Sequence, residues 1–428
     1  MNIPETVKKI LATLNGAGFE AYAVGGCVRD SILGRIPEDW DITTNAEPQE
    51  VKRLFRRTID TGLAHGTITV MYGKEGYEIT TYRLDGTYSD GRHPDSVVFT
   101  PELREDLKRR DFTINAMACG AGGEIVDLFG AREDLRRGVI RCVGEPDERF
   151  TEDALRILRA LRFSAQLNFQ IEEKTWAALR RHAPNLSRVS RERIFAELNK
   201  TLLSEHPERL ELIFDAGLAP YLAEHFPALC CNRTVTVLPK EKYLRWAAVC
   251  RKLPAEEVKR FLREMKSDLT TLERAALLVG RQKERLPQTK EETRILLSEI
   301  GTERFDDLLL LKRLGCAGGE STEKASDSAL LRDIARAAEM KREIIEAGDC
   351  ISLKTLAVGG RDLLQLGVKP GPALGRKLNL LFRAVLKNPA LNQREKLLKL
   401  LEKQGHGDAA SVSGEKENGV GMTGCRGL

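Results

Sequence analysis

The chain of 428 residues is too long for one small hydrophobic core, and its length predicts about two to four domains. Charged residues make up 31% and aromatic residues 6% of the chain, which is typical of a helix-rich protein with a large solvated surface. No apolar run is long enough to cross a membrane, and the N-terminus lacks the apolar core of a signal peptide. We therefore expect no membrane partner and a cytoplasmic location.

The positive charge is concentrated near the C-terminus. The formal net charge is +5, but residues 351–403 carry eleven Lys or Arg and three Asp or Glu, so this segment contributes +8 and the remainder −3. A basic module on a near-neutral body indicates phosphate binding, although solvated helix faces give the same count. The nine cysteines include no CxxC pair, which predicts buried free thiols in a reducing compartment rather than a zinc site or a disulfide framework.

The N-terminal segment predicts a helix, a strand and a turn that can contact phosphate. Residues 4–18 carry apolar side chains at helical spacing and end in glycines, and residues 21–24 form an apolar β-like run. Gly25 and Gly26 follow directly, and glycines let a backbone approach a phosphate group closely. Arg29 then opens an amphipathic segment.

A pair of carboxylates follows this turn. Asp39 and Asp41 flank Trp40 in a segment that we expect to be a strand, where alternate side chains share one face about 7 Å apart. Trp40 then points toward the core. Two neighbouring carboxylates repel unless a cation lies between them, and oxygen ligands at this spacing suit Mg²⁺ completed by waters and substrate phosphates. A solvated strand face is the commoner origin of such a pair in isolation.

The order of strand, glycine pair, Arg-Asp and paired aspartates is more specific than any of its parts. It resembles the first motif of the polymerase-β-like nucleotidyltransferases, and most closely the branch that contains the tRNA CCA-adding enzymes and their poly(A) polymerase relatives. The resemblance implies that Asp39 and Asp41 are catalytic and hold two Mg²⁺ ions. It also implies that Gly26 and Arg29 bind phosphate and sugar of the nucleotide.

The next segment predicts a β-hairpin and a loop. Residues 67–72 and 77–82 form two strand-like runs joined by a glycine-containing turn. Glu78 on the second run is a candidate third carboxylate of the metal site, and an exposed Glu on a half-buried strand is an equal alternative. Residues 84–96 are polar and rich in Gly and Asp, which predicts a mobile loop.

A second charged motif covers residues 108–116, which read KRRDFTINA. Arg110 is a fixed bidentate donor suited to a triphosphate or a sugar, although basic runs before a helix commonly face solvent. The segment is similar, nearly letter for letter, to the second motif of the same family, which implies that Arg110 binds the nucleotide. A turn at 127–132 and a strand at 138–144 complete a predicted head of residues 1–140, with a small mixed sheet flanked by helices.

From residue 146 onward the helical period dominates, and residues 152–163 read EDALRILRALRF. On one helix Asp153 and Arg156, three residues apart, would be neighbours and could form an ordinary surface ion pair. The same pair also matches the edge of a base. The carboxylate can accept from the N4 amine of cytosine or the N6 amine of adenine, while the guanidinium donates to the ring acceptors. Uracil or guanine would leave like groups facing each other.

This EDxxR sequence is similar to the family motif that selects CTP and ATP without a nucleic-acid template. The resemblance extends to Arg159 and Arg162, which match positions that contact the nucleotide. On an ideal helix Arg162 lies opposite Asp153, so Arg159 is the stronger candidate of the two. Residues 190–200 resemble a further motif, which supports the surrounding helices in that family.

A glycine- and proline-rich turn within residues 357–386 precedes a predicted helix. Such a turn is a phosphate site at a helix N-terminus, or an ordinary interhelical turn. The pattern resembles the tail of bacterial-type CCA-adding enzymes, which in that family grips the elbow of tRNA. Residues 405–428 are rich in Gly and Ser without periodicity, and we expect them to be disordered.

The predicted fold class is α+β, with a head at residues 1–140 and an all-α neck at 141–200, body at 201–350 and tail at 351–404. By its motifs the chain is identified as a member of the class II CCA-adding enzymes of the short bacterial type. Membership implies addition of C, C and A to the 3′ end of tRNA from CTP and ATP with Mg²⁺, and release of pyrophosphate.

Other products of the same chemistry stay open, namely addition of A alone, of CC alone, or of a poly(A) tail. CC-adding relatives are expected to lack a loop like residues 84–96, so its presence favours full CCA addition. A non-catalytic RNA-binding protein is the alternative from a different class.

Overall fold

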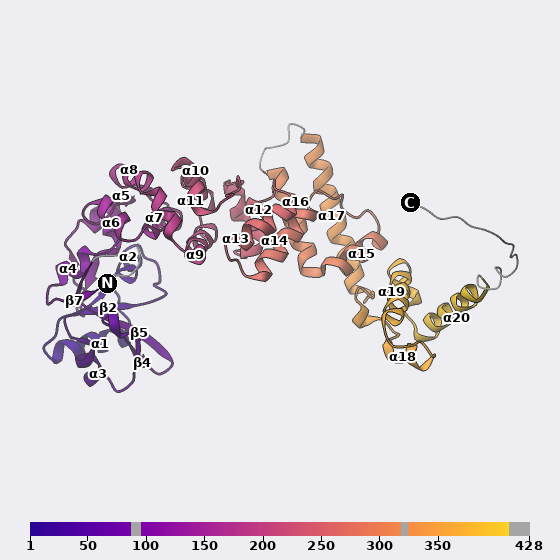
Figure 1. The fold of residues 1–428 in the computed structure, drawn as a ribbon, viewed down its shortest axis with the longest axis horizontal. Helices are drawn as coiled ribbons and strands as arrows, with labels where there is room; N and C mark the ends of the chain where they lie inside the picture. Colours follow the sequence, from indigo (N-terminus) through magenta and orange to yellow (C-terminus); the bar gives the residue numbers. More distant parts are fainter. Residues whose placement is uncertain (87–95, 318–323, 411–428) are drawn as a thin grey trace, which may run out of the picture. The chain divides into compact units, whose positions relative to one another are not determined.

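The computed structural model of the chain describes residues 1–86, 96–317 and 324–410 (Figure 1). They belong to two compact units, Met1–Gly280 and Arg281–Leu428. The first unit combines a mixed β-sheet with helices, and the described part of the second is helical, so the predicted α+β class is confirmed. The boundaries predicted at residues 140, 200 and 350 divide the chain more finely than these units, and they stay a prediction.

The sheet has seven strands in the order β3-β4-β5-β2-β1-β8-β9. It is mixed, because β2 and β5 pair in parallel while the other neighbours are antiparallel. The predicted hairpin is confirmed, and the two-residue turn between β4 and β5 begins at Gly73, whose φ of 63° suits such a turn. The strands are β1 (Ala21–Val24), β2 (Asp41–Thr44), β3 (Thr58–Gly62), β4 (Thr67–Tyr72), β5 (Glu75–Thr81), β8 (Met117–Cys119) and β9 (Ile125–Asp127).

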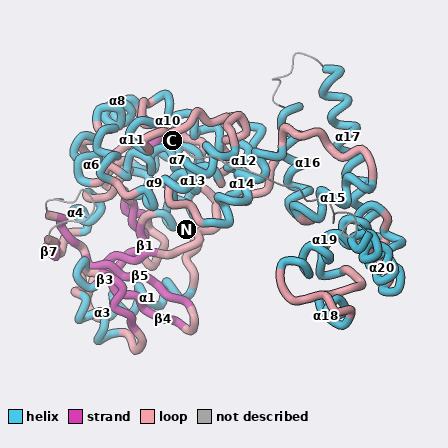
Figure 2. Tube along the Cα trace, turned by 45° about the vertical axis from the view of Figure 1, so that its right-hand side comes forward, coloured by secondary structure: helices cyan, strands magenta, loops and turns pink. Residues whose placement is uncertain are grey.

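Helices α1 and α3 pack against this sheet (Figure 2). α1 buries Val7, Ile10, Leu11 and Leu14, which recur at helical spacing on one face. α2 follows β1 directly and contacts both β1 and β8, so its side chains lie next to the start of β2. The helices of this part are α1 (Glu5–Gly16), α2 (Gly26–Ile32), α3 (Pro48–Leu54), α4 (Leu103–Lys108) and α5 (Ala131–Arg137).

Two strand predictions were wrong in their details. β2 begins at Asp41, so Asp39 precedes the strand, and Trp40 is half-buried rather than in the core. The expected strand at residues 138–144 is the short β10 (Val139–Ile140), which pairs in parallel with β11 (Gln170–Ile171) and does not join the main sheet. Helix α7 (Leu155–Leu167) separates β10 from β11 in the chain, so the local sequence carries no sign of this pairing.

The ends of the predicted loop at residues 84–96 are described as a small hairpin of β6 (Arg83–Asp85) and β7 (Val97–Phe99). Residues 87–95, which make up most of the loop, lie outside the described residues. The expectation of a mobile loop therefore stays a prediction.

Helices form the rest of the first unit and pack around an aromatic core. The rings of Phe195 and Trp246 stack with centroids 5.4 Å apart, and Phe261 meets Trp246 at 5.7 Å. Arg245 is 2% exposed and donates to the backbone carbonyls of Leu202 and Ser204, which fixes the end of α9. The helices are α6 (Pro146–Glu152), α7 (Leu155–Leu167), α8 (Glu173–Arg181), α9 (Arg191–Leu202), α10 (Leu212–Asp215), α11 (Ala219–Leu222), α12 (Lys242–Val249), α13 (Ala255–Glu264) and α14 (Leu269–Arg281).

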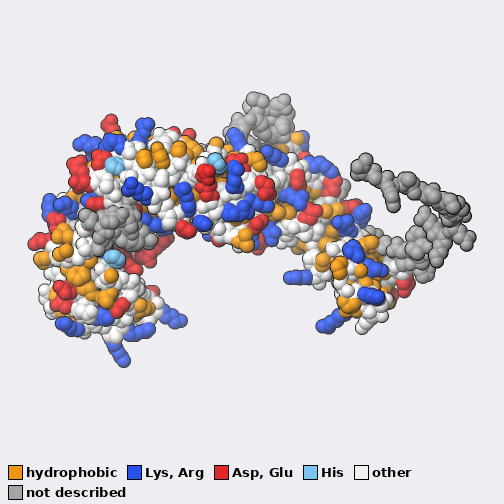
Figure 3. Space-filling model, in the orientation of Figure 1, with side chains coloured by type: hydrophobic (Ala, Val, Ile, Leu, Met, Phe, Trp, Pro, Cys, Tyr) orange, Lys and Arg blue, Asp and Glu red, His pale blue; other side chains and the backbone are white. Residues whose placement is uncertain are grey.

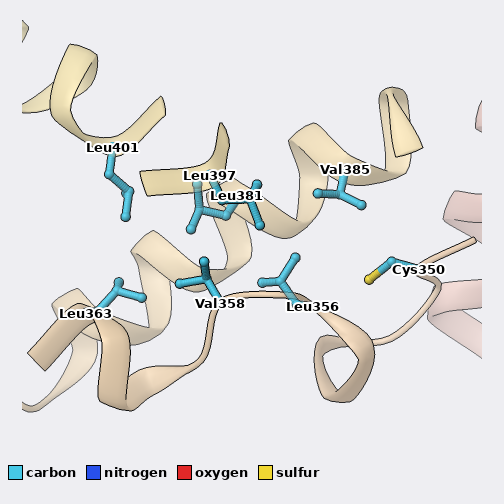
Figure 4. Packing of buried hydrophobic residues seen from close by; sticks show 8 residues of the cluster. All are labelled: Cys350, Leu356, Val358, Leu363, Leu381, Val385, Leu397 and Leu401. Carbon is cyan, nitrogen blue, oxygen red and sulfur yellow. The ribbon is translucent and has the colours of Figure 1, made fainter. Parts of the chain in front are cut away.

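The second unit has a separate apolar core among α18, α19, α20 and the segment before them. Figure 4 shows eight buried residues of this core, from Cys350 to Leu401. Buried Arg294 of α15 donates to the carbonyl of Leu386 and pairs with Asp349, which ties α15 to the end of α19. The helices are α15 (Lys290–Ile300), α16 (Thr302–Ala317), α17 (Lys324–Glu346), α18 (Gly360–Gln365), α19 (Pro372–Lys387) and α20 (Arg394–Ala410).

The last described helix extends further toward the C-terminus than the sequence predicts. α20 runs to Ala410 and so enters residues 405–428, which the composition predicts to be disordered. The remainder, residues 411–428, lies outside the described residues. In the described ranges, no helix has both the length and the apolar character needed to span a bilayer.

Candidate active site

The residues that the sequence singles out lie around one cavity of about 1120 Å³ in the first unit. The cavity is lined by the start of β2, by α2, by the segment after α4 and by α7 and α9. A space of this size accommodates a nucleotide together with part of a second substrate. All nine predicted site residues line it, namely Gly26, Arg29, Asp39, Asp41, Arg110, Asp153, Arg156, Arg159 and Arg162.

Asp39 and Asp41 face the same cavity although they do not share a strand. Asp41 is the first residue of β2 and lies opposite Val24 of β1. Desolvation within the cleft raises the pKa of the Asp41 carboxyl group, Arg110 lowers it, and the charge of Asp39 raises it again. The two carboxylates therefore repel each other, as the sequence predicts, and a cationic ligand would relieve this repulsion.

A third carboxylate lies beside this pair. Ile42 of β2 pairs with Ile79 of β5, and this register sets Glu78 next to Asp41 on the neighbouring strand. Desolvation raises the pKa of Glu78, and the charges of Asp41 and Asp39 raise it further. The sequence left Glu78 open because the parallel register of β2 and β5 cannot be deduced from a local pattern. Within the described ranges, no three His, Cys, Asp or Glu side chains form a ready-made metal site, so these carboxylates form an open set.

Gly25, rather than Gly26, is the glycine of this turn that the geometry requires. Its φ is 83°, and a Cβ atom added there would lie 2.9 Å from Nη1 of Arg110. A Cβ atom at Gly26 would meet Arg29 at an ordinary 3.6 Å. Gly25 therefore allows Arg110 to approach the turn, while Gly26 begins α2 and lines the cavity.

Arg110 is positioned by a buried carboxylate that the sequence did not single out. Asp106 of α4 is fully buried and lies 3.7 Å from Nη2 of Arg110, and it accepts hydrogen bonds from Arg109 and from the hydroxyl of Thr43. Burial alone would raise the pKa of Asp106, but the charges of Arg109 and Arg110 bring it below its usual value. Nε of Arg110 is buried and finds no acceptor among the described residues, but the side chain is 20% exposed and lines the cavity, so its guanidinium can reach a ligand there.

Asp111 connects the second motif to helix α7. This buried carboxylate accepts hydrogen bonds from Nε of Arg159 at 2.6 Å and from the side chain of Asn115 at 3.1 Å. Asn115 in turn accepts from Arg29 at 2.6 Å, and Arg29 also binds the carboxylate of Asp30 through two nitrogens. Burial would raise the pKa of Asp111, but Arg159 and Asn115 bring it to about 2. Only a structure could identify Asp111, because its partners lie far apart in the chain.

The expected arrangement of Asp153 and Arg156 on one helix was wrong. α6 ends at Glu152, Asp153 is extended with φ of −143°, and α7 begins at Leu155. Asp153 accepts from the backbone N–H of Leu155, so its carboxylate binds one of the unpaired donors at the start of α7. The apolar stripe through this segment conceals the break between α6 and α7.

Asp153 and Arg156 also have separate partners. The carboxylate of Asp153 pairs with Arg193 of α9 at 2.8 Å. Arg156 pairs with Glu152 and donates to the carbonyl of Arg109 at 3.1 Å. Both side chains still line the cavity that contains Asp39 and Asp41, so the nucleotide-sized cleft between the two predicted pairs is present.

Arg159 and Arg162 both face the cavity from α7. Arg162 is 6% exposed and donates to Glu197 of α9 at 3.2 Å. Burial lowers the pKa of Arg162 to about 10. The turn at Asp153 means that α7 does not carry Asp153, so the argument that Arg162 lies opposite it on one helix no longer applies.

Three family models match the chain, and together they cover most of it. A poly(A) polymerase head domain matches residues 21–141, an RNA- and SrmB-binding site of polymerase A matches 168–230, and a tRNA nucleotidyltransferase domain 2 matches 239–401. The CCA-adding enzyme of Lactobacillus delbrueckii subsp. bulgaricus is 40% identical over 401 residues, which are 92% of this chain and 96% of that protein. That of Geobacillus kaustophilus is 37% identical over 396 residues, 91% and 94% of the two chains.

The chain is also similar to solved structures over most of its length. The Bacillus stearothermophilus CCA-adding enzyme in complex with CTP matches with a TM-score of 0.79 and 31% identity, over 96% of this chain and all of that one. A tRNA nucleotidyltransferase complexed with a primer tRNA and an incoming ATP analog matches with a TM-score of 0.58 and 27% identity, over 78% of this chain and 99% of that one.

The buried Asp111 generates a prediction about pH and stability. We expect Asp111→Asn to lower the free energy of unfolding at pH 7 by about 2 kcal/mol, because the charged carboxylate that binds Arg159 is lost. A carboxyl group whose folded pKa lies near 2 stabilises the fold above its unfolded pKa, and this contribution disappears as the pH falls through the folded value. The difference between wild type and variant should therefore shrink between about pH 4 and about pH 2 in urea titrations followed by tryptophan fluorescence.

The matched control is Asp215→Asn, because Asp215 is exposed at the end of α10. We expect that variant to change the free energy of unfolding by less than about 0.5 kcal/mol across the range. A deficit of Asp111→Asn that stays constant as the pH falls would contradict the assignment.

Proposed function

Since the chain belongs to the family of CCA-adding enzymes, the tRNA nucleotidyltransferases related to poly(A) polymerases, we propose that it adds C, C and A to the 3′ end of tRNA from CTP and ATP, with release of pyrophosphate. The single cavity that contains both the carboxylates and the candidate base-selecting residues carries this proposal. The relatives share almost the whole chain and are named for full CCA addition, which favours this product over A alone, CC alone or poly(A).

The carboxylates fit Mg²⁺. Asp39, Asp41 and Glu78 offer only oxygen atoms. Desolvation, and after it the charge of the neighbouring carboxylates, raises the pKa values of Asp41 and Glu78, and a divalent cation would neutralise that charge. Their open arrangement suits an ion whose coordination is completed by waters and substrate phosphates. Mg²⁺ bound there would lower the pKa of the RNA 3′-hydroxyl and neutralise the triphosphate during displacement of pyrophosphate.

The residues around the glycine turn hold the triphosphate and the sugar. Arg110 approaches the turn where Gly25 has no side chain, and its partly exposed guanidinium lines the cavity and can donate to a phosphate oxygen. Arg29 is fixed by Asp30 and Asn115, so it presents a fixed donor group at the same wall. Contacts to phosphate and sugar are the same for all four nucleotides, so other residues have to discriminate between the bases.

Asp153 and Arg156 choose the base. Each carboxylate oxygen of Asp153 accepts one hydrogen bond from the protein, from Leu155 or from Arg193, and has capacity for one more. Such an oxygen can accept from the exocyclic amine of cytosine or adenine, and the guanidinium of Arg156 can donate to a ring acceptor. Uracil and guanine would place donor against donor and acceptor against acceptor at this edge, and this mismatch provides the discrimination.

The helices α18–α20 bind tRNA through its backbone phosphates. This part of the second unit carries most of the charge of residues 351–403, and Figure 3 shows Lys and Arg side chains projecting from it. Lys369 lies in the turn before α19, Arg376 lies in the first turns of that helix, and both are exposed.

The free thiols of the cysteines that the structure describes fit the proposed cytoplasmic location, where disulfides are rare.

The product of the reaction tests the proposed function directly. We expect wild-type protein and Mg²⁺ to lengthen a tRNA that lacks its 3′ end by two nucleotides with CTP alone and by three with CTP and ATP together, read on a sequencing gel. Asp39→Ala should abolish both products, because the metal site loses a ligand, and leave tRNA binding close to wild type in a filter assay. A poly(A) product would refute CCA addition, and full activity of Asp39→Ala would refute the metal assignment.

Base selection is tested by competition between nucleotides. We expect Asp153→Ala to reduce discrimination against UTP, measured as the ratio of kcat/KM for CTP and UTP, by about a hundredfold because the amine acceptor is lost. Asp147→Ala on α6 is the matched control, since its carboxylate is half-exposed and pairs with Arg181. An unchanged ratio in Asp153→Ala would remove this residue from base selection.

Phosphate contacts of the second unit are tested by salt dependence. We expect Lys369→Gln combined with Arg376→Gln to weaken tRNA binding and to reduce the slope of log K against log salt by about 1 to 2, because up to two counterion-releasing contacts are lost. Arg332→Gln, on the exposed side of α17, should leave the slope unchanged. Equal slopes for wild type and the double variant would reject this surface as the tRNA grip.

A further inference from the structure

Phe163 of α7 lies at the wall of the active-site cavity under three arginine side chains. It is 5% exposed, and the guanidinium carbons of Arg29, Arg159 and Arg162 lie 5.1, 5.4 and 4.2 Å from the centre of its ring. Each distance is within the range of a cation–π interaction. Arg29 comes from α2, next to the glycine turn, whereas the other two arginines come from α7, so the ring contacts side chains of two separate helices that line the cavity.

The cluster brings three like charges together. Because all three lie close to one ring centre, no two guanidinium carbons are much more than about 10 Å apart. Each arginine has its own carboxylate, and the pairs are Arg29 with Asp30 at 2.9 Å, Arg159 with Asp111 at 2.6 Å and Arg162 with Glu197 at 3.2 Å. Burial lowers the pKa of Arg162, the charge of Glu197 raises it, and the charges of Arg159 and Arg29 lower it further, as like charges at this separation do.

Hydrogen bonds alone do not fix this cluster. Nε of Arg162 and Oε2 of Glu197 are buried and find no partner among the residues that the structure describes. The ion pair between these two side chains therefore has one hydrogen bond, from Nη1 of Arg162 to Oε1 of Glu197. The guanidinium carbon of Arg162, in contrast, lies 4.2 Å from the ring centre of Phe163, closer than those of the other two arginines. The ring therefore contributes strongly to the orientation of a cation whose own hydrogen bonds are incomplete.

Phe163 also contacts the second motif. Its ring meets that of Phe112 edge to face, with centroids 5.9 Å apart. Phe112 directly follows Asp111, the carboxylate that holds Arg159. The ring of Phe163 thus contacts the α2 segment, the second motif and its own helix.

We propose that Phe163 is a positioning residue of nucleotidyl transfer, whose aromatic ring holds Arg29 of α2 and Arg159 and Arg162 of α7 in a fixed relation at the wall that faces the bound nucleoside triphosphate. The proposal rests on the proposed function for the identity of the ligand. Phe163 acts through the arginines and not on the reacting atoms. Its effect is therefore on nucleotide binding and alignment, and not on the affinity for tRNA.

The test separates the aromatic face from apolar volume. Phe163→Leu keeps a buried apolar side chain and removes the ring, while Phe163→Tyr keeps the ring. We expect the leucine variant to raise KM for CTP and for ATP by about tenfold or more, given three cation–π contacts, and the tyrosine variant to stay within about threefold of wild type. The Kd for tRNA should be unchanged in both variants.

Phe261→Leu is the matched control. Phe261 is 2% exposed and packs edge to face against Phe226 and Trp246, and in the described part of the chain no arginine lies over its ring. This variant should lower the melting temperature and leave KM for CTP unchanged. Equal KM values for wild type and Phe163→Leu, or equal increases in both leucine variants, would overturn the proposal and leave Phe163 as core packing.

A second substitution tests the proposal if the leucine variant does not fold. Replacement of Phe163 by 3,4,5-trifluorophenylalanine keeps the ring and withdraws electron density from its face, so KM for CTP should rise severalfold; no rise would overturn the proposal. CTP titration by calorimetry without tRNA separates the two hypotheses. Wild-type protein that binds CTP but extends no tRNA would refute the proposed function alone, whereas fluorinated protein that binds CTP as tightly as wild type would refute the role of the ring alone.

Discussion

The geometry of this cavity depends on the hydrogen bonds that the buried carboxylate of Asp111 accepts. This carboxylate accepts from Arg159 of α7 and from Asn115, and Asn115 accepts from Arg29, so one buried chain of hydrogen bonds connects α2, the second motif and α7. A buried carboxylate is costly unless its partners are all in place. The network therefore favours one relative position of the sheet and of α7, and the nucleotide cleft between them is a consequence of that position.

The charges of the cavity are arranged for a polyanion that arrives with a cation. Asp39 and Asp41 line the cavity and repel each other and the neighbouring Glu78, while Arg29, Arg110 and Arg159 line the same cavity. The carboxylates alone would repel a triphosphate, and the arginines alone would bind one without activating a hydroxyl group. On the proposed function, Mg²⁺ and the triphosphate neutralise the two sets together, so the site is complete only when both are bound.

Local patterns predicted what depends on neighbouring residues. The face of α1, the β4–β5 hairpin and the residues of the charged motifs follow from spacing within a few turns or strands. The sequence did not predict the end of α6 at Glu152, because the carboxylate of Asp153, which accepts from the first N–H of α7, and the apolar stripe occupy the same segment. It also did not predict Asp111 or the placement of Glu78, since a buried ion pair and a parallel register join residues that are far apart in the chain.

The break before α7 changes how base selection is understood. On a continuous helix, Asp153 and Arg156 would neutralise each other and offer the base a weakened edge. In the structure Arg193 and the N–H of Leu155 hold Asp153, while Glu152 holds Arg156, so the two side chains are fixed independently. Cytosine and adenine present an amine beside a ring acceptor in the same order. If Asp153 and Arg156 choose the base as proposed, one fixed edge can accept both bases, and the choice between cytosine and adenine has to come from groups outside this edge.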